Sequence, residues 1–222
     1  KTYDSIPAKF KPLNGRKNII ITRNPDYSIN QILDSDLNVA DQGARGVDTE
    51  IRWSADTAFG QWEASLLWSH LLERTKTAFA GAPEEDLSGR YTDPTAEDGG
   101  AYATDKFNYS VQWYRNNFSV GYLGEFISEL DADTFCNCDS DGDPSNNLPD
   151  GRYIQKIDSQ LYHDLVATYT FQDWGTHIAA GVTNLTDEEP PYIDTGFNAN
   201  TDPSTYRLFG RGYYVRLTQN FE

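Results

Sequence analysis

Hydrophobic side chains at every second position dominate this sequence and constrain its fold more than any other feature. In the run Phe107–Trp113 the odd-numbered residues are apolar and the even-numbered ones polar, and the pattern resumes over Phe118–Phe126 after Asn116–Asn117. Period-two alternation places apolar side chains on one face of a β-strand and polar ones on the other. Two such runs joined by two turn-forming residues indicate a hairpin. We therefore predict an all-β, antiparallel fold.

The same pattern predicts seven strands with two alternating classes of connection between them. The strands lie near 47–55, 62–69, 105–116, 118–130, 153–171, 178–182 and 207–221, with Lys17–Thr22 as a candidate eighth. Tight connections near 57–60, 116–117 and 172–175 alternate with long polar ones at 24–46, 78–104, 131–152 and 186–206. An up-and-down barrel puts all tight turns at one end, and in outer-membrane barrels the long loops at the other end face the outside.

A soluble β-sandwich also has strands with one apolar and one polar face, so alternation alone leaves two architectures open. Four of the predicted strands exceed the ~5–6 residues typical of globular proteins, which favours a transmembrane barrel; they are 105–116, 118–130, 153–171 and 207–221. Aromatic residues also gather at the strand ends, where a membrane interface would lie, at Phe59, Trp62, Trp113, Phe118, Phe171, Trp174 and Phe221. No run reaches the roughly eighteen apolar residues of a transmembrane helix. A mean hydropathy of −0.65 still suits a barrel, because its strands alternate.

The balance of charge limits the classes of partner. Acidic residues outnumber basic ones by 34 to 18, which gives a formal net charge of −16. Because nucleic-acid binding requires cationic groups that neutralise phosphates, we expect no nucleic-acid partner. The 14 Tyr, 11 Phe and 5 Trp exclude a disordered acidic tail.

An ordered series of motifs occupies residues 153–221. Its elements are Ile157–Leu165 (IDSQLYHDL), Gly181–Tyr192 (GVTNLTDEEPPY), Asn200–Asp202 with Tyr206, and Gly210–Leu217 (GRGYYVRL). The series resembles the end of TonB-dependent outer-membrane receptors, in which G-V-x-N-L-(T/F)-D-x-x-P-P-Y precedes a final G-R-x-(Y/F)-Y-V-x-L strand. Gly46–Asp48 is similar to that family's strand start, a weaker match.

The resemblance implies a 22-stranded barrel with an N-terminal plug domain inside it and a short box that binds TonB. Neither is visible in residues 1–222, so we expect this chain to be the C-terminal portion of such a barrel, its last seven or eight strands. The plug and the remaining strands would belong to the N-terminal part of the same receptor, which would also bind TonB. The expected location is the outer membrane of a Gram-negative cell, with membrane lipid as a further partner.

Ligand recognition is expected in the long loops and on inward-facing strand residues. The candidates are Tyr91, Tyr102, Arg115, Glu125, Tyr192, Phe197 and Tyr206. Aromatic rings can stack on a sugar or a catecholate-type ligand, and charged side chains can line a passage. We expect no catalytic residues, since His70, His163 and His177 lie in separate strands without a nucleophile at a suggestive spacing. Asn184 and Asp187 suit an Asx-type turn, which is a structural role.

One acidic segment in the 131–152 loop has ion-binding character. Carboxylates occupy positions 1, 3, 5 and 12 of a calcium-loop spacing, at Asp139, Asp141, Asp143 and Asp150. Pro144 stands where the turn requires Gly, so bound Ca²⁺ and a solvated acidic loop both remain open. Cys136 and Cys138 are too close together to close a useful disulfide loop, and no further Cys or nearby His completes a zinc site.

The function implied by the resemblance is active uptake of a scarce nutrient with energy from TonB and no covalent chemistry. The nutrient classes are a ferric siderophore, another metal chelate, cobalamin or an oligosaccharide. Two alternatives stay open: a complete eight-stranded outer-membrane barrel with a structural or adhesive role, and a secreted calcium-dependent carbohydrate-binding β-sandwich. A sandwich requires residues on different strands to converge into a compact interior, whereas a membrane barrel turns them outward; the diagnostic residues are Trp53, Val111, Tyr169 and Val215.

Overall fold

Alternating apolar residues and tight turns produce a fold built from β-strands. The computed structural model describes residues 17–36, 41–77, 82–92, 99–134, 153–196 and 199–221. Among these residues there is no helix with the length and apolarity needed to cross a membrane. The chain divides into two units, Lys1–Arg45 with Glu73–Leu87 and Gly46–Leu72 with Ser88–Glu222.

The first unit contains a hairpin that the sequence patterns did not predict in full. Strands β1 (Lys17–Arg23) and β2 (Ile29–Asp36) pair antiparallel in a sheet of their own. The turn between them is closed by the amide of Asn24, which donates to the carbonyl oxygen of Ser28 over 2.9 Å. The predicted strand at 17–22 is therefore present, but it pairs with β2, and the predicted long loop at 24–46 contains strand residues.

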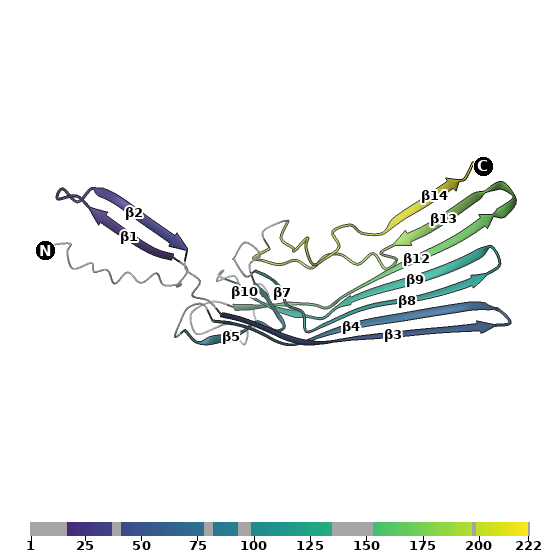
Figure 1. Ribbon diagram of the computed structural model, residues 1–222, viewed down its shortest axis with the longest axis horizontal. Coiled ribbons are helices and arrows are strands. Elements are labelled where there is room, and N and C mark those ends of the chain that lie inside the picture. Colours follow the sequence, from purple (N-terminus) through teal and green to yellow (C-terminus); the bar gives the residue numbers. More distant parts are fainter. Residues whose placement is uncertain are drawn as a thin grey trace. The chain divides into compact units, whose positions relative to one another are not determined.

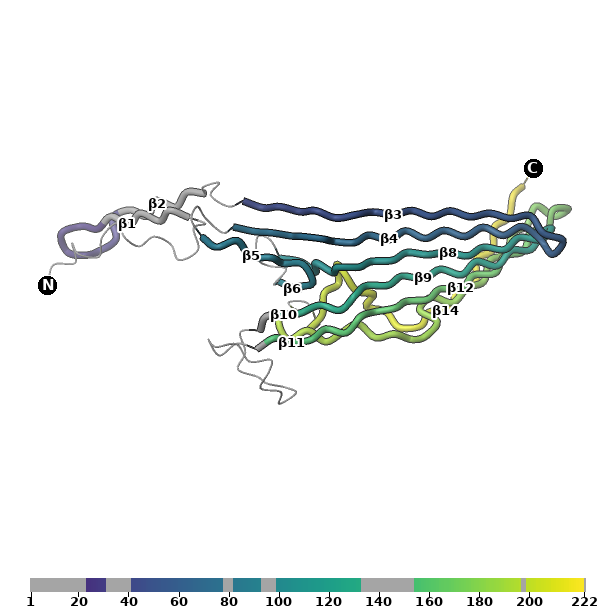
Figure 2. The backbone as a smooth tube through the Cα atoms, turned by 90° about the horizontal axis from the view of Figure 1, so that it is seen from below, coloured from purple at the N-terminus to yellow at the C-terminus, as the bar shows by residue number. Residues whose placement is uncertain are grey.

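Seven strands of the second unit form an antiparallel meander, which confirms the predicted all-β, antiparallel class. They are β3 (Asp41–Thr57), β4 (Gly60–Thr77), β8 (Asp105–Arg115), β9 (Phe118–Ile127), β12 (Gln160–Phe171), β13 (Thr176–Thr183) and β14 (Gly212–Gln219). Each lies beside its neighbour in this order, so β3 and β14 form the two edges (Figure 1). Figure 2 shows β3, β4, β8, β9 and β12 running side by side. The first residues of β3 and the last of β4 belong to the first unit, where β5 (Glu84–Asp86) pairs with β4.

Three tight turns join the strands in pairs, and the strand order places them at the same end of the meander (Figure 1). In the first, the hydroxyl of Thr57 donates to the carbonyl oxygen of Gly60 over 2.7 Å. In the second, Asn116 takes a φ of 53°, a conformation that Asn tolerates better than most residues. The third is a short 3-10 turn over Gln172–Trp174, ended by Gly175 at φ 59°. The predicted tight connections at 57–60, 116–117 and 172–175 are thus confirmed.

The long connections carry short strands, which corrects several predicted boundaries. A four-stranded sheet in the order β11-β10-β6-β7 is formed by β6 (Arg90–Thr92), β7 (Gly100–Ala101), β10 (Leu130–Thr134) and β11 (Tyr153–Ile157). Its β10–β6 pair is parallel. The predicted strands 118–130 and 153–171 are therefore each interrupted, and the last strand begins at Gly212 instead of 207.

A buried core lies at the loop end of the second unit. It joins residues of β6, β9, β10, β11 and β12 to the β13–β14 connection, through Tyr91, Ala103, Ile127, Leu130, Ala132, Ile157, Tyr162, Ile193 and Tyr206. Removing one large side chain of this kind from water stabilises a fold by about 1.5–3 kcal/mol. The β13–β14 connection is therefore packed against the strands by apolar burial.

We predict that Gly60→Ala destabilises the β3–β4 hairpin. Gly60 has a φ of 131°, and a Cβ atom there would lie 2.4 Å from the carbonyl oxygen of Tyr114, which is backbone and cannot move aside cheaply. The strained conformation should cost about 1–3 kcal/mol of unfolding free energy, measured by urea titration. Gly100→Ala is the control, because its new Cβ would meet nothing closer than 3.7 Å. Equal effects of the two substitutions would contradict this account of the turn.

Candidate functional site

The main sheet has one apolar face, because the strand register aligns apolar residues in rows. Residues that pair directly across two strands point to the same face. One row crosses six strands through Ala64, Val111, Tyr122, Leu165, Val182 and Tyr213. A row on the opposite face consists of Gln61, Tyr114, Ser119, Thr168, Ala179 and Arg216. The sheet therefore separates an apolar face from a more polar one.

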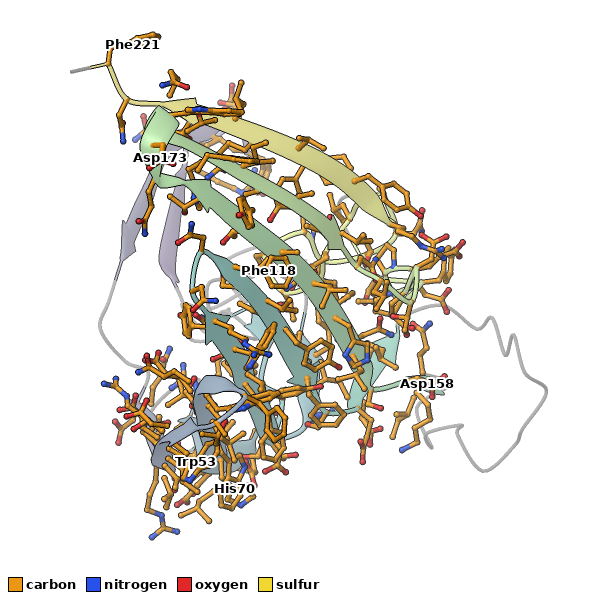
Figure 3. The ribbon with its side chains drawn as sticks, turned by 90° about the vertical axis from the view of Figure 1, so that its right-hand side faces the viewer. Trp53, His70, Phe118, Asp158, Asp173 and Phe221 are labelled. Atoms are coloured by element: carbon orange, nitrogen blue, oxygen red, sulfur yellow. The ribbon has the colours of Figure 1, made fainter. Side chains whose placement is uncertain are left out.

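The apolar face is exposed. Trp53, Val111, Tyr169 and Val215, from four different strands, are 54%, 38%, 41% and 77% exposed. In Figure 3, Trp53 lies at the opposite side of the view from Phe221, with Phe118 between them. These side chains do not converge into a compact interior, and the core described above excludes all four.

Two rows of aromatic contacts cross the apolar face. In the turn-side aromatic row, ring centroids of Trp62 and Trp113 are 6.2 Å apart and those of Trp113 and Phe118 are 5.9 Å apart. The row continues beside the 172–175 turn through Tyr169, Phe171 and Trp174. The loop-side aromatic row consists of two chains of ring contacts, Trp68–Phe107–Phe126 and Tyr109–Tyr122–His163, with neighbouring centroids 5.7–6.1 Å apart within each chain. Such contacts contribute about 0.5–1.5 kcal/mol each beyond burial.

Aliphatic residues predominate between the two aromatic rows, and Tyr109 and Tyr122 of the loop-side row pair in register with Leu66 and Val111 of this band. The aliphatic residues include Ala64, Leu66, Val111, Val120, Leu165, Ala167, Ala180 and Val182. Trp62 and Trp68 are six residues apart on β4, and Phe118 and Phe126 eight apart on β9, which is roughly 20–27 Å along a strand. Aromatic residues at the predicted strand ends indicated the turn-side row only. The loop-side row has a signal of its own in the sequence, a second aromatic residue on the same face of a strand at this spacing.

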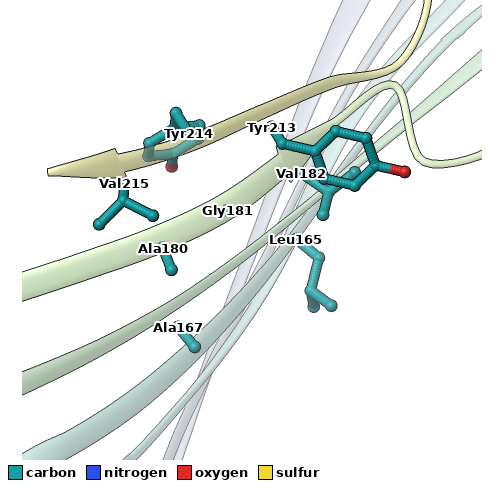
Figure 4. A pocket seen from close by; sticks show the side chains of 8 residues that line it. All are labelled: Leu165, Ala167, Ala180, Gly181, Val182, Tyr213, Tyr214 and Val215. Carbon is teal, nitrogen blue, oxygen red and sulfur yellow. The ribbon is translucent and has the colours of Figure 1, made fainter.

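A shallow groove of about 400 Å³ lies on the apolar band beside β14. Small side chains at Ala167 and Ala180 form its floor, while Leu165, Tyr213 and Val215 are larger side chains beside them (Figure 4). No charged residue lines the groove. It is therefore a mainly apolar hollow, and the polar side-chain groups of its lining are the hydroxyls of Tyr213 and Tyr214.

The opposite face carries cross-strand hydrogen bonds between polar side chains. The hydroxyls of Ser65 and Ser110 lie 2.8 Å apart, and those of Ser119 and Thr168 lie 2.7 Å apart. Near the loop end, Arg207 pairs with Glu125 and Asp164. Burial alone would lower the pKa of Arg207, but these carboxylates outweigh it and raise that pKa above its ordinary value, so the guanidinium stays charged. Arg207 was missed from the sequence because its partners are distant in the chain.

The base of the β13–β14 connection is held by Asn184. Its side-chain amide donates to the carbonyl oxygens of Glu188 over 2.8 Å and Phe209 over 3.3 Å, and its oxygen accepts from the amide of Glu188 over 2.9 Å. The carboxylate of Asp187 accepts from the amide of Arg211 over 2.6 Å. These bonds tie the two ends of the connection together. They agree with the predicted turn at Asn184 and extend it to the far end of the loop.

The predicted ligand residues lie in different surroundings. Tyr91 and Tyr206 are only 2% and 3% exposed and belong to the core, which corrects their assignment as ring faces open to a ligand. Burial raises the pKa of the Tyr206 hydroxyl above its ordinary range, and Asp202 adds to the effect. Tyr192 is exposed, and Tyr102 is half-buried. Phe197 lies outside the described residues.

The two charged candidate residues, Glu125 and Arg115, lie on different faces and at different ends of the sheet. Glu125 pairs in register with Tyr162 and lies on the polar face near the loop end. Arg115 pairs with Phe118 beside the 116–117 turn, on the face that carries Trp113. It is therefore at the end opposite the long connections, which corrects its predicted inward position. The observed position follows from the spacing, because Arg115 follows Trp113 by two residues and so shares its face.

No cluster of metal-ligating side chains emerges in the described part of the chain. Asp139, Asp141, Asp143 and Asp150 lie outside it, as do Cys136 and Cys138. Within the described ranges no three His, Cys, Asp or Glu side chains gather closely enough to hold a metal ion. Each histidine has its own partner: His70 with Asp105 at 2.8 Å, His163 with Tyr122 at 2.6 Å and His177 with Thr170 at 3.0 Å.

Comparison with known proteins gave no match: no family model, no curated protein and no solved structure is significantly similar to this chain. The site must therefore be interpreted from its own geometry.

We predict that Asn184→Ala loosens the base of the β13–β14 connection. The substitution removes three hydrogen bonds of a side chain that is 1% exposed, so unfolding free energy should fall by about 1–3 kcal/mol. Asn116→Ala is a matched control, because Asn116 has nearly the same φ (53° against 51°) but is exposed at a tight turn. Urea unfolding of the full-length variants measures the difference. If Asn116→Ala costs as much, backbone strain and not the side-chain network explains the loss.

Proposed function

We propose that this chain is the C-terminal part of an outer-membrane transport receptor of the TonB-dependent class. The observation that carries the proposal is the exposed apolar face bounded by two aromatic rows. An aliphatic band between two aromatic girdles, with a polar opposite face, is the arrangement of a barrel wall in lipid, whose apolar band is about 25 Å tall. The spacing of the two rows, roughly 20–27 Å along the strands, suits that thickness.

The exposed apolar face of the main sheet would be costly in water. An apolar face that crosses seven strands is far larger than a soluble monomer normally exposes, and it would promote aggregation. Hydrocarbon removes that cost, and aromatic side chains prefer the membrane–water interface. The polar face would then line the barrel interior. The resemblance of Gly181–Tyr192 and Gly210–Leu217 to the TonB-dependent family supports the specific class.

The edges β3 and β14 support a larger barrel. In a bilayer every backbone amide and carbonyl needs a partner, so both edges must pair with further strands. We expect these to be the other strands of the same receptor. A complete eight-stranded barrel is less favoured, because β1, the candidate eighth strand, pairs with β2. The β-sandwich is disfavoured by the exposure of Trp53 and Val215.

In this proposal the long connections bind a scarce nutrient, and TonB-derived energy drives its passage past a plug domain without covalent chemistry. Candidate contacts are Tyr102 and Tyr192 in the connections and Glu125 on the polar face. Calcium in the 131–152 segment and the nutrient classes named above remain part of this hypothesis.

The transport proposal is tested with the full-length protein expressed from its complete reading frame. We expect it to fractionate with the outer membrane, and we expect its tryptophan fluorescence to be quenched by lipids brominated on the acyl chains. The purified periplasmic domain of TonB should bind it as a probe. Recovery of a soluble protein, or quenching no greater than that of a water-soluble control, would overturn the membrane assignment. Lipid quenching without TonB binding would retain a barrel but exclude the receptor class.

We predict that Val111→Arg is far more costly than Gln112→Arg. The two residues are adjacent on β8 and point to opposite faces. Arginine at the lipid midplane should cost about 2–4 kcal/mol, whereas arginine on the interior face should be nearly neutral. Urea unfolding of the full-length protein in lipid vesicles measures both. If Gln112→Arg is the more damaging change, the faces are assigned the wrong way round.

A further inference from the structure

The end of the β13–β14 connection is anchored on two neighbouring strands by a single side chain. The Nη1 atom of Arg207 donates to both carboxylate oxygens of Asp164, over 2.8 and 3.0 Å. Its Nε and Nη2 atoms lie 3.0 and 2.9 Å from Oε2 of Glu125. Its guanidinium carbon is 5.1 Å from the ring centroid of Tyr162. The guanidinium is therefore held on both of its edges and on one planar face.

The three partners form a preset socket on the polar face. Tyr162 and Glu125 are direct register partners on β12 and β9, and Asp164 is the next residue of β12 on the same face. The strand ladder fixes the backbone positions of all three residues, and Tyr162 also packs in the buried core with Ile193 and Tyr206 of the connection. A forked, planar guanidinium matches the socket, whereas an ammonium group would make fewer bonds.

The socket also receives the beginning of the connection. The amide of Asn184 donates to Oδ1 of Asp164 over 2.8 Å, so one carboxylate binds residues 184 and 207 together. Between them, the segment touches β11 through Gln155, whose side-chain oxygen accepts from the amide of Asp194 and whose amide donates to the carbonyl oxygen of Tyr192. Asp164 thus closes the loop, and Gln155 holds its middle.

We propose that Arg207 is a positioning residue that fixes the β13–β14 connection against the polar face, so that Tyr192 is presented in one conformation. Arg207 itself touches no ligand in this role; it acts through the connection. That Tyr192 belongs to a recognition surface rests on the proposed function. The clamping of residues 184–211 by Arg207 does not, since it follows from the contacts alone.

The test is hydrogen exchange of the full-length protein in detergent. Arg207→Met keeps the bulk of the side chain but removes every ion pair, so amide exchange in residues 184–211 should accelerate about tenfold while β12 and β13 stay protected. Arg211→Met is the control, because Arg211 is the other arginine of the connection and its side chain makes one ion pair of 3.7 Å with Asp187. It should leave exchange unchanged.

Exchanging the charges of Arg207 and Asp164 distinguishes a positioning role that depends on the ion pair from a role in packing alone. Arg207→Asp combined with Asp164→Arg restores opposite charges and should recover much of the lost protection, which a packing role would not do. If Arg207→Met does not fold, Arg207→Lys replaces it and should give intermediate exchange confined to the connection. Unchanged exchange in either variant, or faster exchange spread evenly over β12 and β13, would overturn the proposal. If the unmodified protein does not locate to the membrane or does not bind TonB, the transport function is overturned. The role of Arg207 in holding the connection is not affected by that result.

Discussion

The structure depends on one constraint, the alternation of side chains along strands that stay in register across the sheet. Each strand of the meander supplies apolar residues to one face, and each pairing preserves that face for the next strand. A slip of one residue at any pairing would turn a whole strand's apolar set to the polar side. The tight turns at 57–60, 116–117 and 172–175 prevent this, because short connections fix the register of the two strands that they join.

This constraint distributes stability unevenly. The apolar band of the main sheet is exposed, while the buried core lies at the loop end, around Tyr91, Tyr162 and Tyr206. A globular domain would bury its largest apolar face first. Here the buried apolar residues hold the connections in place, and the large apolar face of the main sheet stays exposed. The proposed membrane environment would account for that order, since lipid would remove the face from water and the protein would need to organise only its polar side.

The sequence was sufficient for the features that follow from local patterns. Alternation in Phe107–Trp113 and Phe118–Phe126 predicted strands, face and turn correctly, because each depends on residues close in the chain. The errors concern longer-range relations. The predicted loop at 24–46 contained a strand pairing, and Tyr91 and Tyr206 were taken as surface rings. The strand pairing and the burial of the two tyrosines both depend on which other segment packs against them. The spacing and polarity of nearby residues do not carry that information. Arg115 is different: its face was available from its spacing to Trp113.

Arg207 illustrates why the candidate site was harder to predict than the fold. Its partners Glu125 and Asp164 are 82 and 43 residues away in sequence. They become neighbours only because β9 pairs with β12 in a register that aligns Glu125 with Tyr162. The socket is thus a product of the same strand pairing that aligns the apolar rows on the opposite face. Any shift that spoiled the aromatic rows would also separate the two carboxylates, so a single register sets both the apolar face and the polar face of this sheet.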